Sequence, residues 1–178
     1  MQGPVIFSED AVTTPFDVLA MPATREPVSL LSVTRAIAEF RGERAVVIRG
    51  GGGNAVLALA AESASAGPLA GVVARCQAAP VLAVTARRAA VLGLAHTVGR
   101  IAVISSAAGL DADTIRALAN PLADPIAEGT LGDAARAALT VTIKETPTYD
   151  CESAAVTLAK LARLLPAAVS APILDPSA

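Results

Sequence analysis

Short apolar runs alternate along this chain with segments in which apolar residues recur every three or four positions. The runs are bounded by Gly, Pro, Ser or charged residues, as buried strands are, and the spacing between them is that of amphipathic helices. The pattern predicts strands at 44–48, 56–59, 81–84, 101–104, 141–143 and 168–171. It predicts helices at 29–40, 65–75, 86–92, 111–119, 132–139 and 152–165. This alternation indicates an α/β (α+β) domain of three layers, with a mixed β-sheet and helices on both of its faces.

The first 28 residues differ from the rest, because prolines interrupt any long element there. We expect residues 1–28 to be an N-terminal arm or extension and residues 29–178 to form the domain. A surface tail and an arm that crosses onto a second subunit both fit this segment.

Composition excludes several classes of function. The 178 residues carry a formal charge of -2, and only 2% of them are aromatic, so neither a basic footprint nor a base-stacking platform for nucleic acid is evident. No apolar run approaches the roughly 18 residues of a membrane span, and the N-terminus lacks the basic start of a leader. Two cysteines cannot form a disulfide framework. We therefore expect a cytoplasmic protein with no nucleic acid and no membrane as partner.

Several motifs occur in a familiar order. Residues 44–48 follow the first helix, residues 80–85 read Pro-Val-Leu-Ala-Val-Thr, and residues 111–119 read Asp-Ala-Asp-Thr-Ile-Arg-Ala-Leu-Ala. From about residue 31 to residue 173 the chain resembles 3,4-dihydroxy-2-butanone 4-phosphate synthase, which makes the four-carbon precursor of riboflavin. The resemblance implies that family's fold, a homodimer with its cleft near the subunit boundary, and a domain truncated at its C-terminus.

The catalytic motifs of that family are replaced here. Its closing helix opens with Gly-Gly-His-Thr-Glu-Ala, and the His that binds magnesium falls on Cys151, the Thr on Glu152 and the Glu on Ser153. Its acidic loop falls on residues 49–54, which read Arg-Gly-Gly-Gly-Gly-Asn and contain no carboxylate. Because hard cations prefer carboxylate oxygens, we expect no magnesium site of the family type and no cofactor.

The glycine run also invites comparison with a phosphate-binding loop. The Lys that follows in such loops is absent, and the next residues read as a strand rather than a helix, so a turn beside the inherited cleft is the better interpretation. We expect a small-molecule substrate to be contacted by this turn, by the next matched turn and by the start of the last helix. The candidate substrate-binding residues are Arg49, Gly51, Gly52, Asn54, Arg75, Cys76 and Ser153.

The strongest chemical candidates lie at the start of the last helix, at Tyr149, Asp150, Cys151 and Glu152. A helix N-terminus stabilises anions and lowers the pKa of a thiol. Glu152 or Asp150 would be the general base, and Tyr149 would donate a hydrogen bond to an oxyanion. In the alternative, Asp150 only caps the helix and Glu152 is only an acidic residue of its first turn.

His96 is the only histidine and precedes a strand, where it is either an acid or base of the site or an exposed loop residue. We expect one mostly apolar pocket walled by residues 49–54, by 75 and 76, by His96 and by residues 149–153.

Two classes of function fit these residues. The first is a repurposed enzyme that performs metal-independent proton transfer, isomerisation, elimination or cyclisation of a non-phosphorylated carbonyl compound in specialised metabolism. The second is a catalytically inactive relative that binds a ligand or a partner subunit.

Overall fold

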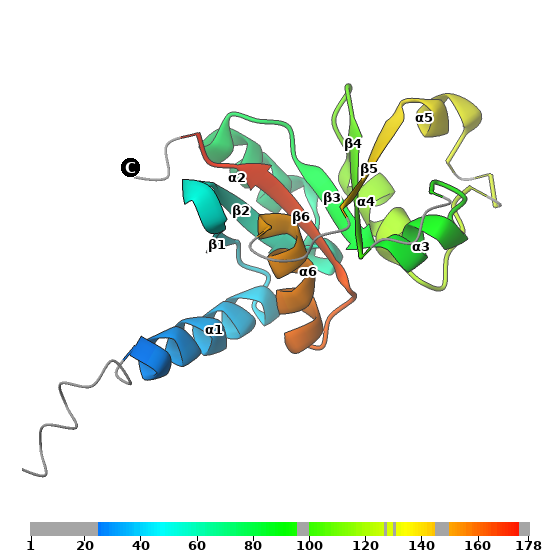
Figure 1. Cartoon of the computed structure of the whole chain (residues 1–178). Coiled ribbons are helices and arrows are strands. Elements are labelled where there is room, and N and C mark those ends of the chain that lie inside the picture. The colour runs from blue at the N-terminus through cyan, green and yellow to red at the C-terminus, as the bar shows by residue number, and fades with distance from the viewer. Residues whose placement is uncertain (1–24, 96–99, 127, 130, 145–149, 175–178) are drawn as a thin grey trace, which may run out of the picture. The chain divides into compact units, whose positions relative to one another are not determined.

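The computed structural model describes residues 25–95, 100–126, 128, 129, 131–144 and 150–174. Tertiary contacts divide the chain into two units, Met1–Thr34 and Arg35–Ala178. The first helix, α1 (Arg25–Arg41), crosses this boundary, and the whole sheet belongs to the second unit (Figure 1). None of the helices in the described part of the chain is long and apolar enough to span a membrane.

The second unit is built on a six-stranded sheet with the order β1-β2-β6-β3-β4-β5. Its strands are β1 (Val46–Arg49), β2 (Ala55–Ala60), β3 (Val81–Thr85), β4 (Ile101–Ser106), β5 (Leu139–Lys144) and β6 (Ala167–Pro172). Every pair of neighbouring strands is antiparallel. The last strand, β6, therefore lies in the interior of the sheet, between β2 and β3.

The predicted elements are all present, with ends that shift by a few residues, and helices cover both faces of the sheet as expected. We expected a mixed sheet. The structure makes this more specific, because all five strand pairings are antiparallel. The unbroken apolar sequence of β2 and the largely apolar sequence of β6 are explained by burial on two faces, which does not require parallel neighbours.

One face of the sheet is covered by α6 (Cys151–Leu161) and by the end of α1. The contact is made mostly of alanines that are fully buried, among them Ala58, Ala155, Ala159 and Ala168. Small side chains let the helix approach the strands closely, which explains how a core with almost no aromatic residues is filled. Phe40 of α1 is the single large aromatic side chain of this cluster.

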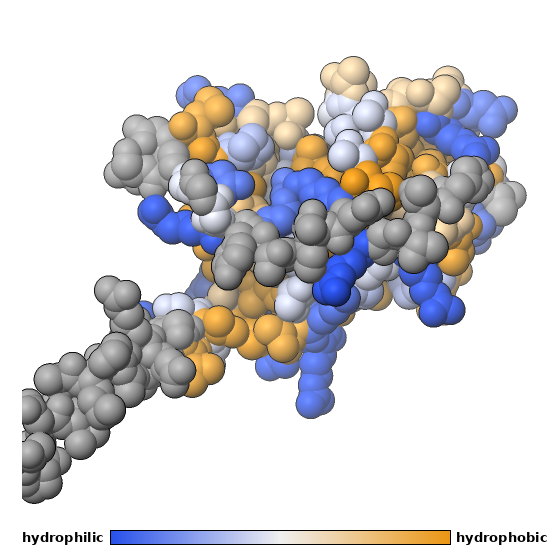
Figure 2. Space-filling view, viewed as in Figure 1, coloured by the Kyte–Doolittle hydropathy of each residue, from blue (hydrophilic) through white to orange (hydrophobic). Residues whose placement is uncertain are grey.

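The opposite face is covered by α2 (Ala66–Cys76), α3 (Ala86–Val91) and α4 (Ala112–Ala119). Larger aliphatic residues fill this layer, including Leu59, Leu82, Ile104 and Val169 from the strands. A fifth helix, α5 (Asp133–Ala137), buries none of its residues, and two short 3-10 turns lie at Gly51–Gly53 and Ala61–Ser63. Hydrophobic and hydrophilic residues are intermingled on the surface in Figure 2.

Candidate functional site

The start of α6 is fixed by a side-chain cap. One carboxylate oxygen of Asp150, Oδ2, accepts hydrogen bonds from the backbone N–H and the hydroxyl of Ser153, each at 3.0 Å. These bonds satisfy a backbone donor that the first turn of a helix leaves free. Asp150 thus has the capping role that we considered as the alternative to catalysis, and Ser153 is buried beneath it.

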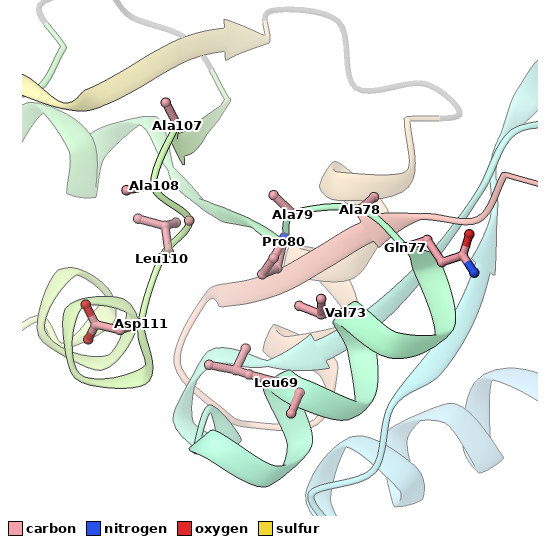
Figure 3. A pocket seen from close by; sticks show the side chains of 12 residues that line it. Leu69, Val73, Gln77, Ala78, Ala79, Pro80, Ala107, Ala108, Leu110 and Asp111 are labelled. Carbon is pink, nitrogen blue, oxygen red and sulfur yellow. The ribbon is translucent and has the colours of Figure 1, made fainter.

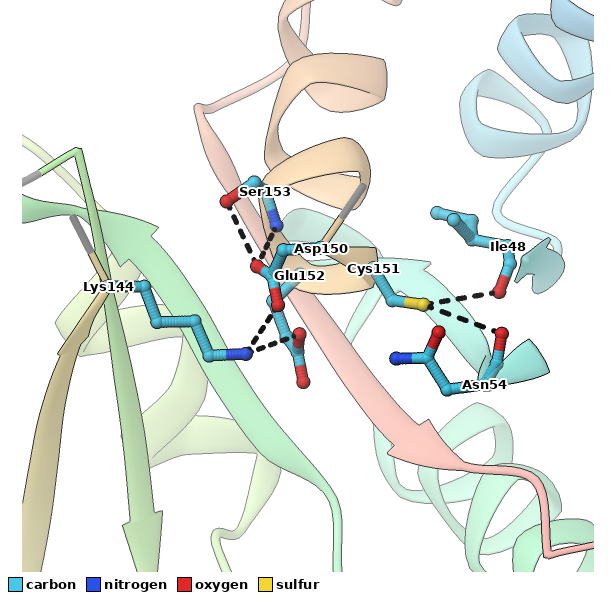
Figure 4. Close-up of polar contacts among 7 residues, drawn as sticks. All are labelled: Ile48, Asn54, Lys144, Asp150, Cys151, Glu152 and Ser153. Carbon is cyan, nitrogen blue, oxygen red and sulfur yellow. Dashed lines mark hydrogen bonds and ion pairs between the residues drawn. The ribbon is translucent and has the colours of Figure 1, made fainter. Parts of the chain in front are cut away.

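The second oxygen of Asp150 belongs to an ion cluster (Figure 4). Lys144, at the end of β5, places its Nζ 2.5 Å from Asp150 Oδ1 and 2.8 Å from Glu152 Oε2. The two acidic side chains are each 18% exposed and that of Lys144 is 31% exposed. One ammonium group therefore holds two carboxylates in a partly buried position.

The cluster shifts the pKa values of its members. Burial would raise the pKa of Asp150, but its hydrogen bonds with Lys144 and Ser153 outweigh this effect and lower it to about 2. Burial would likewise lower the pKa of Lys144, yet its bonds to the two carboxylates raise it above the ordinary value. Lys144 is therefore a cation at neutral pH, and Asp150 is too weak a base to take a proton efficiently.

Cys151 differs from our expectation of an activated thiol. Its side chain is buried, and its Sγ lies 3.6 Å from the backbone oxygen of Ile48 and 4.0 Å from that of Asn54. Burial raises the pKa of this thiol, and the charges of Glu152 and Asp150 raise it further. The direction of this shift is opposite to the low thiol pKa that we expected at a helix N-terminus.

The glycine run forms the turn that joins β1 to β2. A 3-10 turn at Gly51–Gly53 is closed by a hydrogen bond of 2.9 Å from the Gly50 N–H to the Asn54 oxygen. Gly53 has a φ of +82°, which favours glycine at this position. The Cys151 contacts place this turn beside the start of α6, as we expected for residues 49–54. Arg49 is exposed at the end of β1.

Arg75 and Cys76 do not join this group. Cys76 is buried with Leu57 and Val72 in the layer under α2, whereas Cys151 packs with the strand residues that face α6. Successive residues of a strand point to opposite faces, so the two cysteines lie on opposite sides of the sheet. Arg75 is exposed and donates to the Gly71 oxygen of its own helix. The expected single pocket walled by all of these residues is therefore not formed.

Two further candidates, His96 and Tyr149, lie outside the described residues. Their catalytic roles stay predictions.

A hollow of about 680 Å³ opens on the α2 side of the sheet (Figure 3). Leu69 and Val73 of α2 form one wall, and apolar residues of two loops, 78–80 and 107–110, form the others. Asp111, the cap of α4, is the charged residue among those that line it. None of the candidate residues at the start of α6 lines this hollow.

Solved structures with the same fold identify the architecture. A two-domain 3,4-dihydroxy-2-butanone 4-phosphate synthase from A. baumannii matches 80% of this chain and 48% of its own, with a TM-score of 0.60 and 16% identity. The same enzyme from Candida albicans matches 80% of both chains, with a TM-score of 0.55 and 20% identity. The fold is that of the 3,4-dihydroxy-2-butanone 4-phosphate synthases. The chain spans about half the length of the two-domain enzyme, and neither a family model nor a curated protein sequence matches it.

One further match, with a TM-score of 0.56 and 22% identity, is a synthase of this kind in complex with two magnesium ions. The described residues at the start of α6 do not offer an open site for such an ion. The described residues contain no group of three or more His, Cys, Asp or Glu side chains that could hold a metal. Cys151 is buried against backbone oxygens, and Asp150 and Glu152 are bonded to Lys144.

Lys144 is the residue that sequence reasoning missed. It lies outside every matched motif, although only six residues separate it from Asp150 and eight from Glu152. A weak signal did exist, because Lys144 and Lys160 are the only lysines of a chain that otherwise uses arginine. A compact ammonium group suits a position that must contact two carboxylates at once.

Proposed function

We propose that this protein is an enzyme with a dihydroxybutanone-phosphate-synthase-like fold that transfers a proton on a non-phosphorylated carbonyl compound. The observation that carries the proposal is the contact of 2.8 Å between Lys144 Nζ and Glu152 Oε2 at the start of α6. A fixed cation beside a carboxylate supplies both partners of an enolisation, namely a group that stabilises an oxyanion and a base.

In the proposed reaction the substrate's carbonyl oxygen accepts a hydrogen bond from the Lys144 ammonium group. The Glu152 carboxylate takes the proton from the neighbouring carbon, and the C–H electron pair forms the C=C bond of the enolate. Negative charge then develops on the oxygen, next to Lys144. Where the substrate has a C=C bond next to the deprotonated carbon, the enolate is conjugated with it. Return of the proton from Glu152 to the far carbon of that bond then shifts the C=C bond, regenerates the carbonyl group, and restores the enzyme.

The other residues of the cluster would position this pair. Asp150 holds Lys144 from the other side and caps the helix that carries Glu152. We also propose a homodimer, as the resemblance described above implies, a cytoplasmic location, as expected from the composition, and a place in specialised metabolism. Light scattering of the purified protein tests the dimer directly.

Replacement of Glu152 by Gln tests the proposal. The change keeps the size of the side chain and removes the base, so turnover should fall by roughly 10²-fold or more. Glu62→Gln, which changes an acidic residue outside the cluster, is the control for net charge. Wild-type turnover in the Glu152→Gln variant, measured on a carbonyl substrate found by screening, would refute the proposal.

The second candidate is a catalytically inactive relative that binds a ligand. The hollow under α2 favours it, since about 680 Å³ lies within the range typical of small-molecule sites and its walls are mostly apolar. A ligand screen by thermal shift on wild type and on Ala108→Leu, which fills the hollow, tests this function. Ala154→Leu on the exposed side of α6 is the matched control. A hit that binds both variants equally would exclude the hollow as its site.

A further inference from the structure

The hollow on the α2 side of the sheet has a single charge on an otherwise neutral lining. Of the described residues that line it, Asp111 alone is ionisable, and most of the others are apolar. In Figure 3 Asp111 lies at one end of the labelled residues, and the neutral amide of Gln77 lies at the other. A ligand that fills the hollow therefore meets apolar walls and one ionisable group.

Asp111 is ionised at neutral pH. Its Oδ1 accepts a hydrogen bond of 2.9 Å from the backbone N–H of Thr114, and its Oδ2 accepts one of 2.7 Å from the Thr114 hydroxyl. These bonds lower the pKa of the carboxyl below its ordinary value. An ionised carboxylate has about four acceptor sites, so its oxygens can accept a further donor.

The charge of Asp111 is not cancelled by its surroundings in α4. The N-terminus of a helix is equivalent to roughly half a positive charge, which is less than the full negative charge of the carboxylate. Arg116 of the same helix pairs with Asp113 rather than with Asp111. A negative charge thus lies at one end of an apolar surface, where it favours a cation.

We infer that the hollow takes a small molecule with an apolar body and one cationic group, such as an alkylamine, and that Asp111 binds the cation. The inference rests on the second candidate function, ligand binding in the hollow, and adds the chemical class of the ligand. It does not depend on the enolisation proposed at the start of α6, because Lys144 and Glu152 do not line the hollow.

Three probes with the same chain and different head groups test the inference: octylamine, octanol and octanoate, each at neutral pH and below its micellar concentration. In calorimetric titrations of wild type, the amine should bind about 3- to 10-fold more tightly than the alcohol, because hydrogen bonds between charged groups are stronger than those of neutral groups. Octanoate should bind most weakly. Ala108→Leu, which fills the hollow, should remove measurable binding of all three, whereas Ala154→Leu should bind them as wild type does.

Neutral variants of Asp111 isolate the effect of its charge. Asp111→Asn retains a good helix cap, so the amine and the alcohol should then bind within about 2-fold of each other. Asp111→Ser, a second neutral cap, should give the same result and replaces Asp111→Asn if that variant does not fold. Asp113→Asn removes a carboxylate that is 89% exposed and does not line the hollow, and it should keep the wild-type preference.

The possible failures are distinguishable. Equal binding of the three probes that is lost in Ala108→Leu would overturn the choice of a cation but leave ligand binding in the hollow intact. Binding of octylamine that persists in Ala108→Leu would place the amine elsewhere and overturn the inference. No binding of any probe to wild type, as when a second copy of the chain covers the hollow, would overturn the inference and the second candidate function together.

Discussion

Asp150 links the charge state of a single residue to the stability of the domain. Its pKa of about 2 lies below the ordinary value of 3.8. A carboxyl whose pKa is lower in the folded state adds stability that is present above about pH 4 and lost as the pH falls towards 2. The shift corresponds to about 2 kcal/mol of unfolding free energy.

We therefore predict that Asp150→Asn unfolds with a weaker dependence on pH between about pH 4 and pH 2 than wild type does. Asn still caps a helix well, so the change removes the charge and retains the cap. Urea unfolding at several pH values measures the difference. Asp113→Asn removes an exposed carboxylate in the first turn of α4 and is the control. Its free energy of unfolding should depend on pH as that of wild type does. Parallel pH profiles for wild type and Asp150→Asn would contradict the cluster as described.

Ser170 differs from Asp150, because its side chain has no hydrogen-bond partner among the described residues. It is fully buried in β6, and among the described residues its Oγ is the buried side-chain oxygen that lacks a hydrogen-bond partner. Burial of an unsatisfied hydroxyl is unfavourable.

Ser170→Ala should accordingly raise the free energy of unfolding by about 1 kcal/mol. Chemical denaturation measures this change, and Ser105→Ala on β4, which is only partly buried, is the control. A loss of stability on Ser170→Ala would mean that the hydroxyl has a partner, such as a buried water molecule.

At the scale of the elements, one arginine joins two helices. Arg88 of α3 donates to the backbone oxygens of Leu118, Ala117 and Ala123, at 2.8, 3.3 and 2.6 Å. Two of these oxygens belong to the last turn of α4, whose carbonyls have no partner within the helix. The guanidinium group reaches all three because its donors are arranged as a planar fork.

We predict that Arg88→Lys destabilises the protein by about 1–2 kcal/mol, because a lysine ammonium cannot reproduce this arrangement. The neighbouring Arg87 is exposed, so Arg87→Lys should have almost no effect. Thermal unfolding of the two variants provides the comparison. Equal melting temperatures would show that water replaces the lost bonds without cost.

The elements themselves were largely predictable, and their partners were not. Apolar periodicity located β2 and α6 because the buried residues of each element follow the spacing of a strand or a helix within a short stretch of sequence. It could not show that β6 lies between β2 and β3, since pairing depends on residues far apart in sequence. The candidate site has a different limit: the grouping at residues 150–153 was found, whereas Lys144, six and eight residues from its two partners, was missed because apolar periodicity carries no information about ion pairs. Cys76 was grouped with Cys151 because sequence order does not reveal the face on which a helix packs.

At the scale of the whole molecule, the sheet order predicts a gradient of stability. Backbone amides of β2, β3, β4 and β6 are covered on both sides by neighbouring strands, whereas β1 and β5 are edges. Native-state hydrogen exchange should therefore be slowest in the four interior strands and fastest in β1 and β5. Exchange of β6 at the rate of the edge strands would show that the β1–β2 and β3–β4–β5 parts open separately.

The interior position of β6 also has a consequence during synthesis of the chain. While the ribosome is still making α6, the hairpin of β1 and β2 and the three strands β3, β4 and β5 can each pair, but no strand yet joins the two groups. The inner edges of β2 and β3 then present unpaired backbone groups, which are templates for aggregation. Completion of the sheet must wait for the last strand, so a nascent chain that stalls before residue 167 should depend on chaperones more than the finished protein does.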